Sequence, residues 1–338
     1  MVLVNEQDYI ARTDAASDTL WEPLWRIATP LLPVEKRILQ SSALRRLHYV
    51  HHGGASRINT HHTFSRLQHT LGVFSLIAHY CPDNGTLRAA SLLHDIGHGP
   101  FSHSLEGIEE IDHHQWTRDM LFGEELSGIL QEHGIHPEEI WAYVHGEVPS
   151  LLRNSTGVLH LDHLDSWARS AQAGGYLPVE PNELLDRLFP APDGVQADRE
   201  AAELMVDLIV EEAKFHTSPA NIAANSELRQ IVFQWIREAR PDKRQLIGMT
   251  DSMLEQELLR HPGTSGRLRR LLLESWRLRV TRDRDQAPAD ALEVEVNKLY
   301  LSVPMVQGRK ITEISKRARG RIEDVQHRKG KYYVYWQD

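Results

Sequence analysis

The sequence lacks the features that would place it in several large protein classes. Cys81 is the only cysteine among 338 residues, which excludes an internal disulfide and a cysteine-ligated zinc cluster. No run approaches 18 uninterrupted apolar residues, and the N-terminus has no basic start followed by an apolar stretch. We therefore expect a cytoplasmic protein without membrane contacts, in which histidine and carboxylate side chains would bind any metal.

Positive charge is also scarce. The chain has 38 Lys+Arg against 47 Asp+Glu and a formal net charge of −9, so nucleic acid is not an expected partner. The 41% of hydrophobic residues is enough for one large or two modest domains with true cores. Histidine, with 20 residues, is the compositional exception.

The first histidine-containing segment of interest is RAASLLHDIGHGPFSHSLE, residues 88–106. It predicts an apolar helix that ends at a glycine-rich turn. His94 and Asp95 are about 100° apart around a helix axis, so both can reach one divalent cation. So many titratable groups in an apolar segment are costly unless they bind something. The later titratable residues of the segment are His98, His103 and Glu106.

A second segment, SRLQHTLGVFSLIAHY at residues 65–80, predicts an amphipathic helix because its apolar residues recur with a period of about 3.6. Arg66 and His69 are three residues apart and project from neighbouring positions of the first turns. A single histidine on such a helix is more often packed than a ligand. The nearby arginine and the His-Asp pair that follows 25 residues later favour a ligand.

The third segment is VLHLDHLDSWARSAQAGGY, residues 158–176. On a helix, Asp162, Asp165 and Arg169 fall on one side and the leucines on the other. An ion pair between Asp165 and Arg169, four residues apart, accounts for Asp165. It does not account for Asp162, which we take as a candidate ligand.

In chain order, His69, His94, Asp95 and Asp162 resemble the H…HD…D signature of the HD-domain metal-dependent phosphohydrolases. Within that superfamily the sequence is most similar to the deoxynucleoside-triphosphate triphosphohydrolases and their relatives. The words SRLQHTLGV, LLHDIGHGPFSHSLE, DHHQW and HLDHLDSWARS occur in the family's order, and the similarity covers roughly residues 41–169. The resemblance implies that these four residues are the metal ligands.

The same resemblance implies roles around the metal. His98, His103 and His113 match positions that line the catalytic pocket, and His103 or His113 would be the general acid or base. Glu106, where the family usually has Asp, would orient that histidine. Arg66 would contact phosphate oxygens in a bidentate manner.

Other positions depart from the triphosphohydrolase pattern. The family has Lys, Tyr and Asp after the last ligand, where this chain has His163, Ser166 and Ser170. A later family helix carries Arg, His and Tyr, where this chain has Ser218, Ile222 and Ser226. If no other basic residue lines the pocket, we expect fewer phosphates to be favoured and weak discrimination among deoxynucleoside triphosphates. The substrate-binding candidates are Arg66, His163, Ser166 and Arg169.

Two imidazoles and two carboxylates predict one divalent metal ion, Mn, Fe, Co, Ni or Mg in preference to Zn. A second metal ion remains an alternative. The expected substrate is a nucleotide or other phosphorylated small molecule, hydrolysed at a phosphate ester or anhydride. Two alternatives are a phosphodiesterase for cyclic or signalling nucleotides and a nucleotide-binding regulator without turnover.

The expected fold is mostly α, an HD-domain helical bundle with a small C-terminal α+β appendage. We divide the chain into an N-terminal extension (1–40), a catalytic core with a helical extension (41–285) and a small basic region (286–338). The last region alternates like strands and, from residue 291 on, has 10 Lys+Arg against 6 Asp+Glu. A sheet that closes the helical domain, or a contact in an expected homo-oligomer, is favoured over an anion-binding role.

Overall fold

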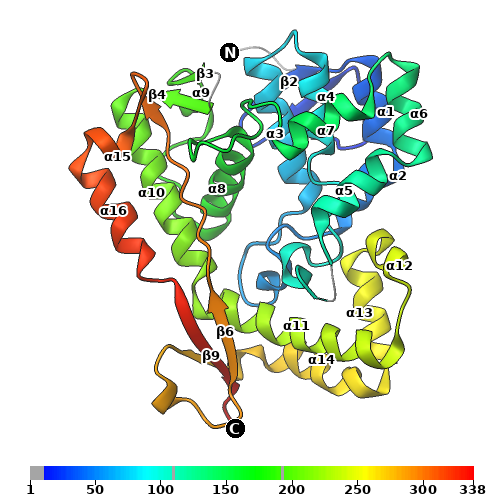
Figure 1. The fold of residues 1–338 in the computed structure, drawn as a ribbon, viewed down its shortest axis with the longest axis vertical. Coiled ribbons are helices and arrows are strands. Elements are labelled where there is room, and N and C mark those ends of the chain that lie inside the picture. The colour runs from blue at the N-terminus through cyan, green and yellow to red at the C-terminus, as the bar shows by residue number, and fades with distance from the viewer. Residues whose placement is uncertain (1–10, 109–110, 192–193) are drawn as a thin grey trace.

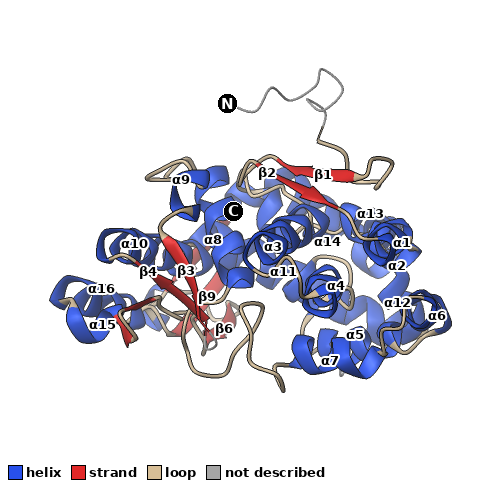
Figure 2. Ribbon diagram, turned by 90° about the horizontal axis from the view of Figure 1, so that it is seen from above, coloured by secondary structure: helices blue, strands red, loops and turns tan. Residues whose placement is uncertain are grey.

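The computed structural model describes residues 11–108, 111–191 and 194–338, and it is mainly helical (Figures 1 and 2). This confirms the mostly α fold that the sequence predicts. Residues 1–10 of the expected N-terminal extension lie outside the described part. Among the described helices, none combines the length and apolar character needed to span a bilayer. The site is built on α3 (Arg66–Tyr80), α4 (Gly85–Leu93), α5 (His113–Leu121) and α8 (Leu161–Gly174).

Helix α3 lies at the centre of the first hydrophobic core. Ser65 caps it by accepting a hydrogen bond from the Gln68 N–H, and the Gln68 side chain accepts one from the Ser65 N–H. Twelve of its 15 residues are buried, and it packs against α4 and α8. Gly72 makes the approach of α8 feasible, because a Cβ there would lie 1.9 Å from Asp165 Oδ1.

The N-terminal segment belongs to this core. Strands β1 (Thr19–Glu22) and β2 (Ile27–Pro30) form an antiparallel hairpin, and Leu20, Trp25 and Ile38 are buried with the residues of α3. The segment predicted as an extension therefore packs into the catalytic core. The other helices of this part are α1 (Pro33–Gln40), α2 (Ser42–Arg46), α6 (Glu124–Glu132), α7 (Pro137–His145), α9 (Asn182–Leu185) and α10 (Arg199–His216).

A second core forms around α11 (Pro219–Ala239), which packs against α14 (Pro262–Glu274). Helices α12 (Lys243–Gly248) and α13 (Asp251–Arg260) complete the helical part. A three-stranded antiparallel sheet covers one end, in the order β5 (Leu278–Thr281), β9 (Gly330–Trp336), β6 (Leu292–Val296). This sheet buries Tyr332 and Val334 against α11.

The C-terminal region packs back against the first core. A four-stranded sheet has the order β3 (Leu188–Ala191), β4 (Gly194–Ala197), β7 (Met305–Val306), β8 (Arg309–Lys310). Between β6 and β7 the chain runs past α8 and α10 (Figure 1, orange), and Val303 pairs with Val158 just before α8. The last helices are α15 (Ile311–Ile314) and α16 (Lys316–Gln326).

Two arginines of the C-terminal region, Arg317 and Arg321, form ion pairs with carboxylates of α10. Arg317 lies 2.7 Å from Asp207 and 3.3 Å from Glu203, and Arg321 lies 3.3 Å from Asp207. Helix α16 packs along α10 through these pairs and through buried Ile322 and other apolar residues. The arrangement agrees with the expected closing role of this region.

Candidate metal centre and active site

Four side chains from three segments converge at one point. His69 projects from α3, His94 and Asp95 directly follow α4, and Asp162 lies in the first turn of α8. His69 Nε2 lies 3.2 Å from Asp162 Oδ1 and 3.7 Å from Asp95 Oδ2. His94 Nε2 lies 3.8 Å from Asp162 Oδ1 and 3.6 Å from Asp95 Oδ1. Metal bonds of about 2.1 Å at right angles or wider place ligand atoms roughly 3–4 Å apart, so these four His–Asp distances fit one cation. His69, His94 and Asp95 form one compact group of possible ligands, and Asp162 also groups with His160 and His163.

Each imidazole is oriented through its other ring nitrogen. His69 Nδ1 lies 2.8 Å from Asp165 Oδ2, and His94 Nδ1 lies 2.8 Å from the Ser91 carbonyl oxygen. Each Nδ1–H is the donor in this arrangement, so each Nε2 keeps a lone pair for the centre. His94 Nε2 is buried and has no hydrogen-bond partner among the described residues. A bound cation would satisfy it.

The electrostatics of the cluster also fit a cation. Burial alone would lower the pKa of His69, but hydrogen bonds to Asp162 and Asp165 raise it to about 9. Burial would raise the pKa of Asp95, and yet His94 and Arg66 hold it well below its usual range. The carboxylates thus draw positive charge to this point, and the residues present fit a divalent metal ion.

Arg66 orients Asp95, one of the candidate metal ligands. It is 3% exposed, its guanidinium donates to Asp95 Oδ2 at 2.7 Å, and its Nε donates to Ser102 Oγ at 3.0 Å. Ser102 lies in the short 3-10 helix η4 (Ser102–Leu105) and donates to the His51 carbonyl oxygen at 2.6 Å. Arg66 also lines the pocket, and a third bond runs from its guanidinium to the His52 carbonyl oxygen at 3.5 Å.

Arg169 lies behind the metal ligands. It is 6% exposed, donates to Asp165 Oδ2 at 2.8 Å and pairs with Glu22. Trp25 Nε1 donates to Asp165 Oδ1 at 2.7 Å. Asp165 is therefore fixed by two donors and in turn fixes His69. The structure places Arg169 outside the pocket lining and gives it a positioning role in place of the predicted substrate contact.

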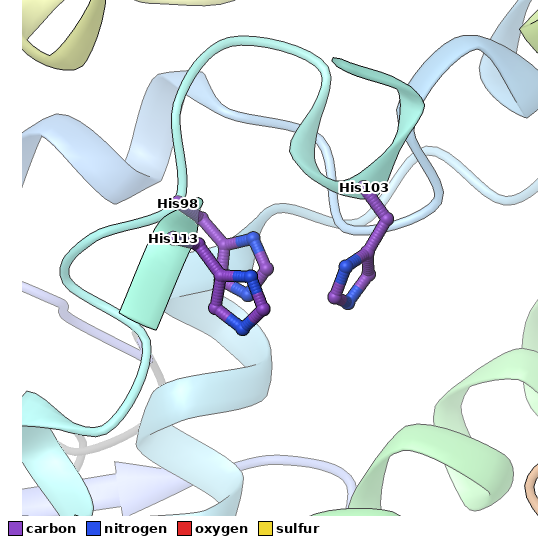
Figure 3. Close-up of side chains that lie close together, drawn as sticks. All are labelled: His98, His103 and His113. Carbon is purple, nitrogen blue, oxygen red and sulfur yellow. The ribbon is translucent and has the colours of Figure 1, made fainter. Parts of the chain in front are cut away.

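Three further histidines stand next to the metal ligands (Figure 3). The rings of His98 and His113 are stacked, with centroids 4.3 Å apart and planes 15° apart, and His103 meets His98 edge-on at 4.5 Å. Glu106 Oε2 lies 2.7 Å from His113 Nδ1 and 3.6 Å from His103 Nδ1. Burial would raise the pKa of Glu106, but hydrogen bonds from His103 and His113 hold it well below its usual range. Glu106 therefore stays ionised and orients His113.

The same trio bears on the alternative of a second metal ion. Its ligand nitrogens lie within 4.8 Å of one another. A metal ion lies near the plane of each imidazole that binds it, however, and the nearly parallel rings of His98 and His113 do not share a plane. This geometry disfavours one metal ion shared by His98 and His113.

One pocket of about 440 Å³ is lined by members of both groups, namely Arg66, His94, Asp95, Asp162, His98, His103 and His113. His163 and Ser166 line it, as do residues that sequence reasoning missed. Arg153 comes from the loop before α8, and Lys298 and Tyr300 come from the segment between β6 and β7. The basic character of the C-terminal region was visible in the sequence, but no motif tied Lys298 to the histidines.

The HD domain family matches residues 66–189, a range that contains all four candidate ligands. This segment is therefore similar to HD domains. Two curated relatives are the uncharacterized proteins YdhJ and YwfO of Bacillus subtilis (strain 168), each 28% identical, over 209 and 167 residues. The matches cover 56% of this chain and 60% of YdhJ, and 43% of this chain and 38% of YwfO. They span less than two thirds of either relative.

Solved structures share the fold over nearly the whole chain. A hypothetical protein from Aquifex aeolicus gives a TM-score of 0.68 at 18% identity, covering 94% of this chain and 96% of that one. A phosphohydrolase from Bacteroides thetaiotaomicron gives a TM-score of 0.70 at 15% identity, covering 95% and 100%. The shared architecture therefore includes most of the C-terminal region as well as the HD domain.

Proposed function

We propose that the protein is a metal-dependent phosphohydrolase that cleaves a phosphate ester or anhydride of a nucleotide. The observation that carries this proposal is the convergence of His69, His94, Asp95 and Asp162 on one point beside the pocket. The HD domain and the likeness to a phosphohydrolase fold support the reaction class.

The chemistry divides between the metal and the histidines. A divalent ion held by the four ligands would neutralise phosphate charge and lower the pKa of a bound water. His113 is fixed at Nδ1 by Glu106, which leaves Nε2 to give or take a proton in the pocket. His98, 1% exposed, has a pKa well below its usual value because of burial. It stays neutral, with Nε2 3.4 Å from Asp95 Oδ1.

Two cations at the pocket support an anionic substrate. Arg153 donates to the Val144 carbonyl oxygen at 3.2 Å, and Lys298 Nζ lies 4.5 Å from the centroid of the Tyr300 ring. Neither forms an ion pair with a carboxylate in the described part of the chain. Arg153 and Lys298 supply positive charge at the pocket that His163 and Ser166 cannot supply. The expectation of fewer phosphates depended on the pocket having no other basic residue in its lining. Arg153 and Lys298 line the pocket, and we therefore propose a substrate with more than one phosphate.

The test is a nucleotide panel with Mn²⁺, Co²⁺, Ni²⁺ and Mg²⁺. It would contain nucleoside mono-, di- and triphosphates and cyclic nucleotides, with products separated by chromatography. We expect metal-dependent hydrolysis that Asp95→Ala abolishes. Hydrolysis confined to cyclic nucleotides would establish the phosphodiesterase, and tight binding without turnover would establish the regulator. Activity that survives Asp95→Ala would refute the metal assignment.

A further inference from the structure

One wall of the pocket carries buried polar atoms that have no hydrogen-bond partner among the described residues. Glu212, on α10, is 4% exposed, and while its Oε1 lies 3.0 Å from His216 Nε2, its Oε2 is unpaired. Ser170 Oγ and both ring nitrogens of His62 are also buried and form no hydrogen bond of normal geometry, although Ser170 lies beside both His62 and Tyr176. Glu212, Ser170 and His62 line the pocket, and we call them the polar wall. Leaving such atoms unpaired costs free energy, so a pocket that gathers them is built for a ligand or ordered water.

The neighbouring carboxylate shows that this orientation is specific to Glu212. Glu211, the preceding residue on α10, lies 2.6 Å from Lys214 and 3.6 Å from Arg321 of α16. Glu211 therefore belongs to the contact between α10 and α16, whereas Glu212 faces the pocket. Lys214, Arg317 and Arg321 are paired with Glu211 or Asp207 and not with Glu212.

Flat rings connect the polar wall with the metal centre. His62 stacks on Phe215, with centroids 3.7 Å apart and planes 15° apart. The Tyr300 centroid lies 6.4 Å from that of His216 and 5.4 Å from that of His163, and His163 follows the ligand Asp162 directly. Burial lowers the pKa of His62, so at neutral pH its ring offers one donor and one acceptor.

We propose that the polar wall binds the organic part of the substrate and that Glu212 Oε2 accepts a hydrogen bond from a sugar hydroxyl or a base amino group. A carboxylate cannot donate, so it selects a ligand that carries a donor at this position. Ser170 and His62 both donate and accept, and the rings suit a heteroaromatic base. The ligand class is a nucleoside phosphate. The inference relies on the proposed function only in placing a phosphate at the metal.

The test measures binding of four probes to the Mn²⁺-loaded protein by calorimetry. The probes are AMP, 2′-deoxy-AMP, 3′-deoxy-AMP and IMP, each analogue lacking one donor of AMP. We expect the wild-type protein to bind at least one analogue about tenfold or more weakly than AMP, as for a lost hydrogen bond to a charged group. The analogue that loses affinity identifies the donor as a hydroxyl or an amine.

Variants of Glu212 then test whether this residue causes the preference for AMP over the weak analogue. Glu212→Leu should reduce the difference between AMP and the weak analogue to less than about threefold, because the acceptor is gone. Glu212→Gln keeps a neutral acceptor and the bond to His216, so the difference in affinity between AMP and the weak analogue should be intermediate. If Glu212→Leu does not fold, Glu212→Gln is the variant that tests the role of Glu212. Glu211→Gln is the matched control and should keep the wild-type pattern.

Several outcomes would overturn the inference: no binding of any probe, equal binding of all four to the wild type, or an unchanged preference in the Glu212 variants. Its failure is distinct from failure of the proposed function. Glu212-dependent binding without hydrolysis of any nucleotide would sustain the polar wall and refute the phosphohydrolase. Hydrolysis without Glu212 dependence would do the reverse.

Discussion

Removal of Asp165 should weaken both metal binding and the stability of the fold. It is fully buried and accepts hydrogen bonds from His69 Nδ1 at 2.8 Å, Trp25 Nε1 at 2.7 Å and Arg169 Nε at 2.8 Å. Asp165→Ala leaves Arg169 with Glu22 as its remaining carboxylate. Removing one partner of a buried ion pair typically costs about 3–5 kcal/mol of the free energy of unfolding.

The same change frees the His69 ring. Loss of a carboxylate that orients a metal-ligating histidine typically weakens metal affinity roughly 10- to 100-fold. We therefore expect Asp165→Ala to bind Mn²⁺ more weakly by this factor and the metal-free protein to unfold at lower urea concentration. Calorimetric titration and urea denaturation in EDTA measure the two effects separately.

Asp162→Ala is the matched comparison because its side chain is a candidate ligand. It should abolish stoichiometric metal binding but cost the metal-free protein less stability than Asp165→Ala, since Asp162 lies among other carboxylates and makes no bond to Arg169. Wild-type metal affinity in Asp165→Ala would refute the orienting role. Full loss of metal in Asp165→Ala together with retention in Asp162→Ala would move the fourth ligand by one turn of α8.

Three further outcomes follow from the site. His113→Ala should keep the metal and lower kcat by about 10²–10⁴-fold, the usual contribution of a general acid or base; unchanged kcat in both this variant and His103→Ala would exclude His103 and His113 from proton transfer. Lys298→Ala and Arg153→Ala should raise KM for nucleoside di- and triphosphates more than for monophosphates, an effect that added salt should reduce; equal changes for all three would remove these cations from the phosphate site. The raised pKa of His69, about 9, should stabilise the metal-free protein fully below pH of about 6.5 and progressively less as pH rises through about 9, and urea denaturation in EDTA at pH 6 to 10 would contradict this if stability were flat.

The candidate metal ligands could be found from the sequence because local patterns carry them. The apolar period of α3 and α8 fixes which side chains share a face, and the adjacent His94 and Asp95 end a helix at a glycine-rich turn. Arg169 shows the limit of this reasoning. Its ion pair with Asp165 follows from their spacing of four residues, but its burial depends on Glu22 and Trp25 of the N-terminal hairpin. The local sequence pattern around Arg169 does not predict that this hairpin packs behind α8.

The residues of the pocket wall were harder to predict from the sequence because they come from segments that are far apart in the chain. Lys298 and Tyr300 reach the pocket only because the chain between β6 and β7 passes α8, a path fixed by the pairing of Val303 with Val158. Glu212 had no signal that distinguished it from Glu211. Its role emerges from which side of α10 meets α16 and which side meets the pocket.

The charges of the metal centre explain why it suits a divalent cation. The buried network around His69 contains four carboxylates and two guanidiniums, and so it carries a net charge near −2 when all are ionised. Burial raises the pKa of Glu22, but the adjacent Arg169 favours its ionised form. The members are Glu22, Asp95, Asp162, Asp165, Arg66 and Arg169.

A divalent ion would bring this network close to neutrality, and it would then leave little positive charge for a substrate with several phosphates. Arg66 lines the pocket, but its charge is already counted in this network through its pair with Asp95. Additional positive charge is available outside the ligand network, where Arg153 and Lys298 line the same pocket without carboxylate partners among the described residues. Despite the net charge of −9, the proposed anionic substrate would meet local positive charge in the pocket, from the metal ion and from Arg153 and Lys298.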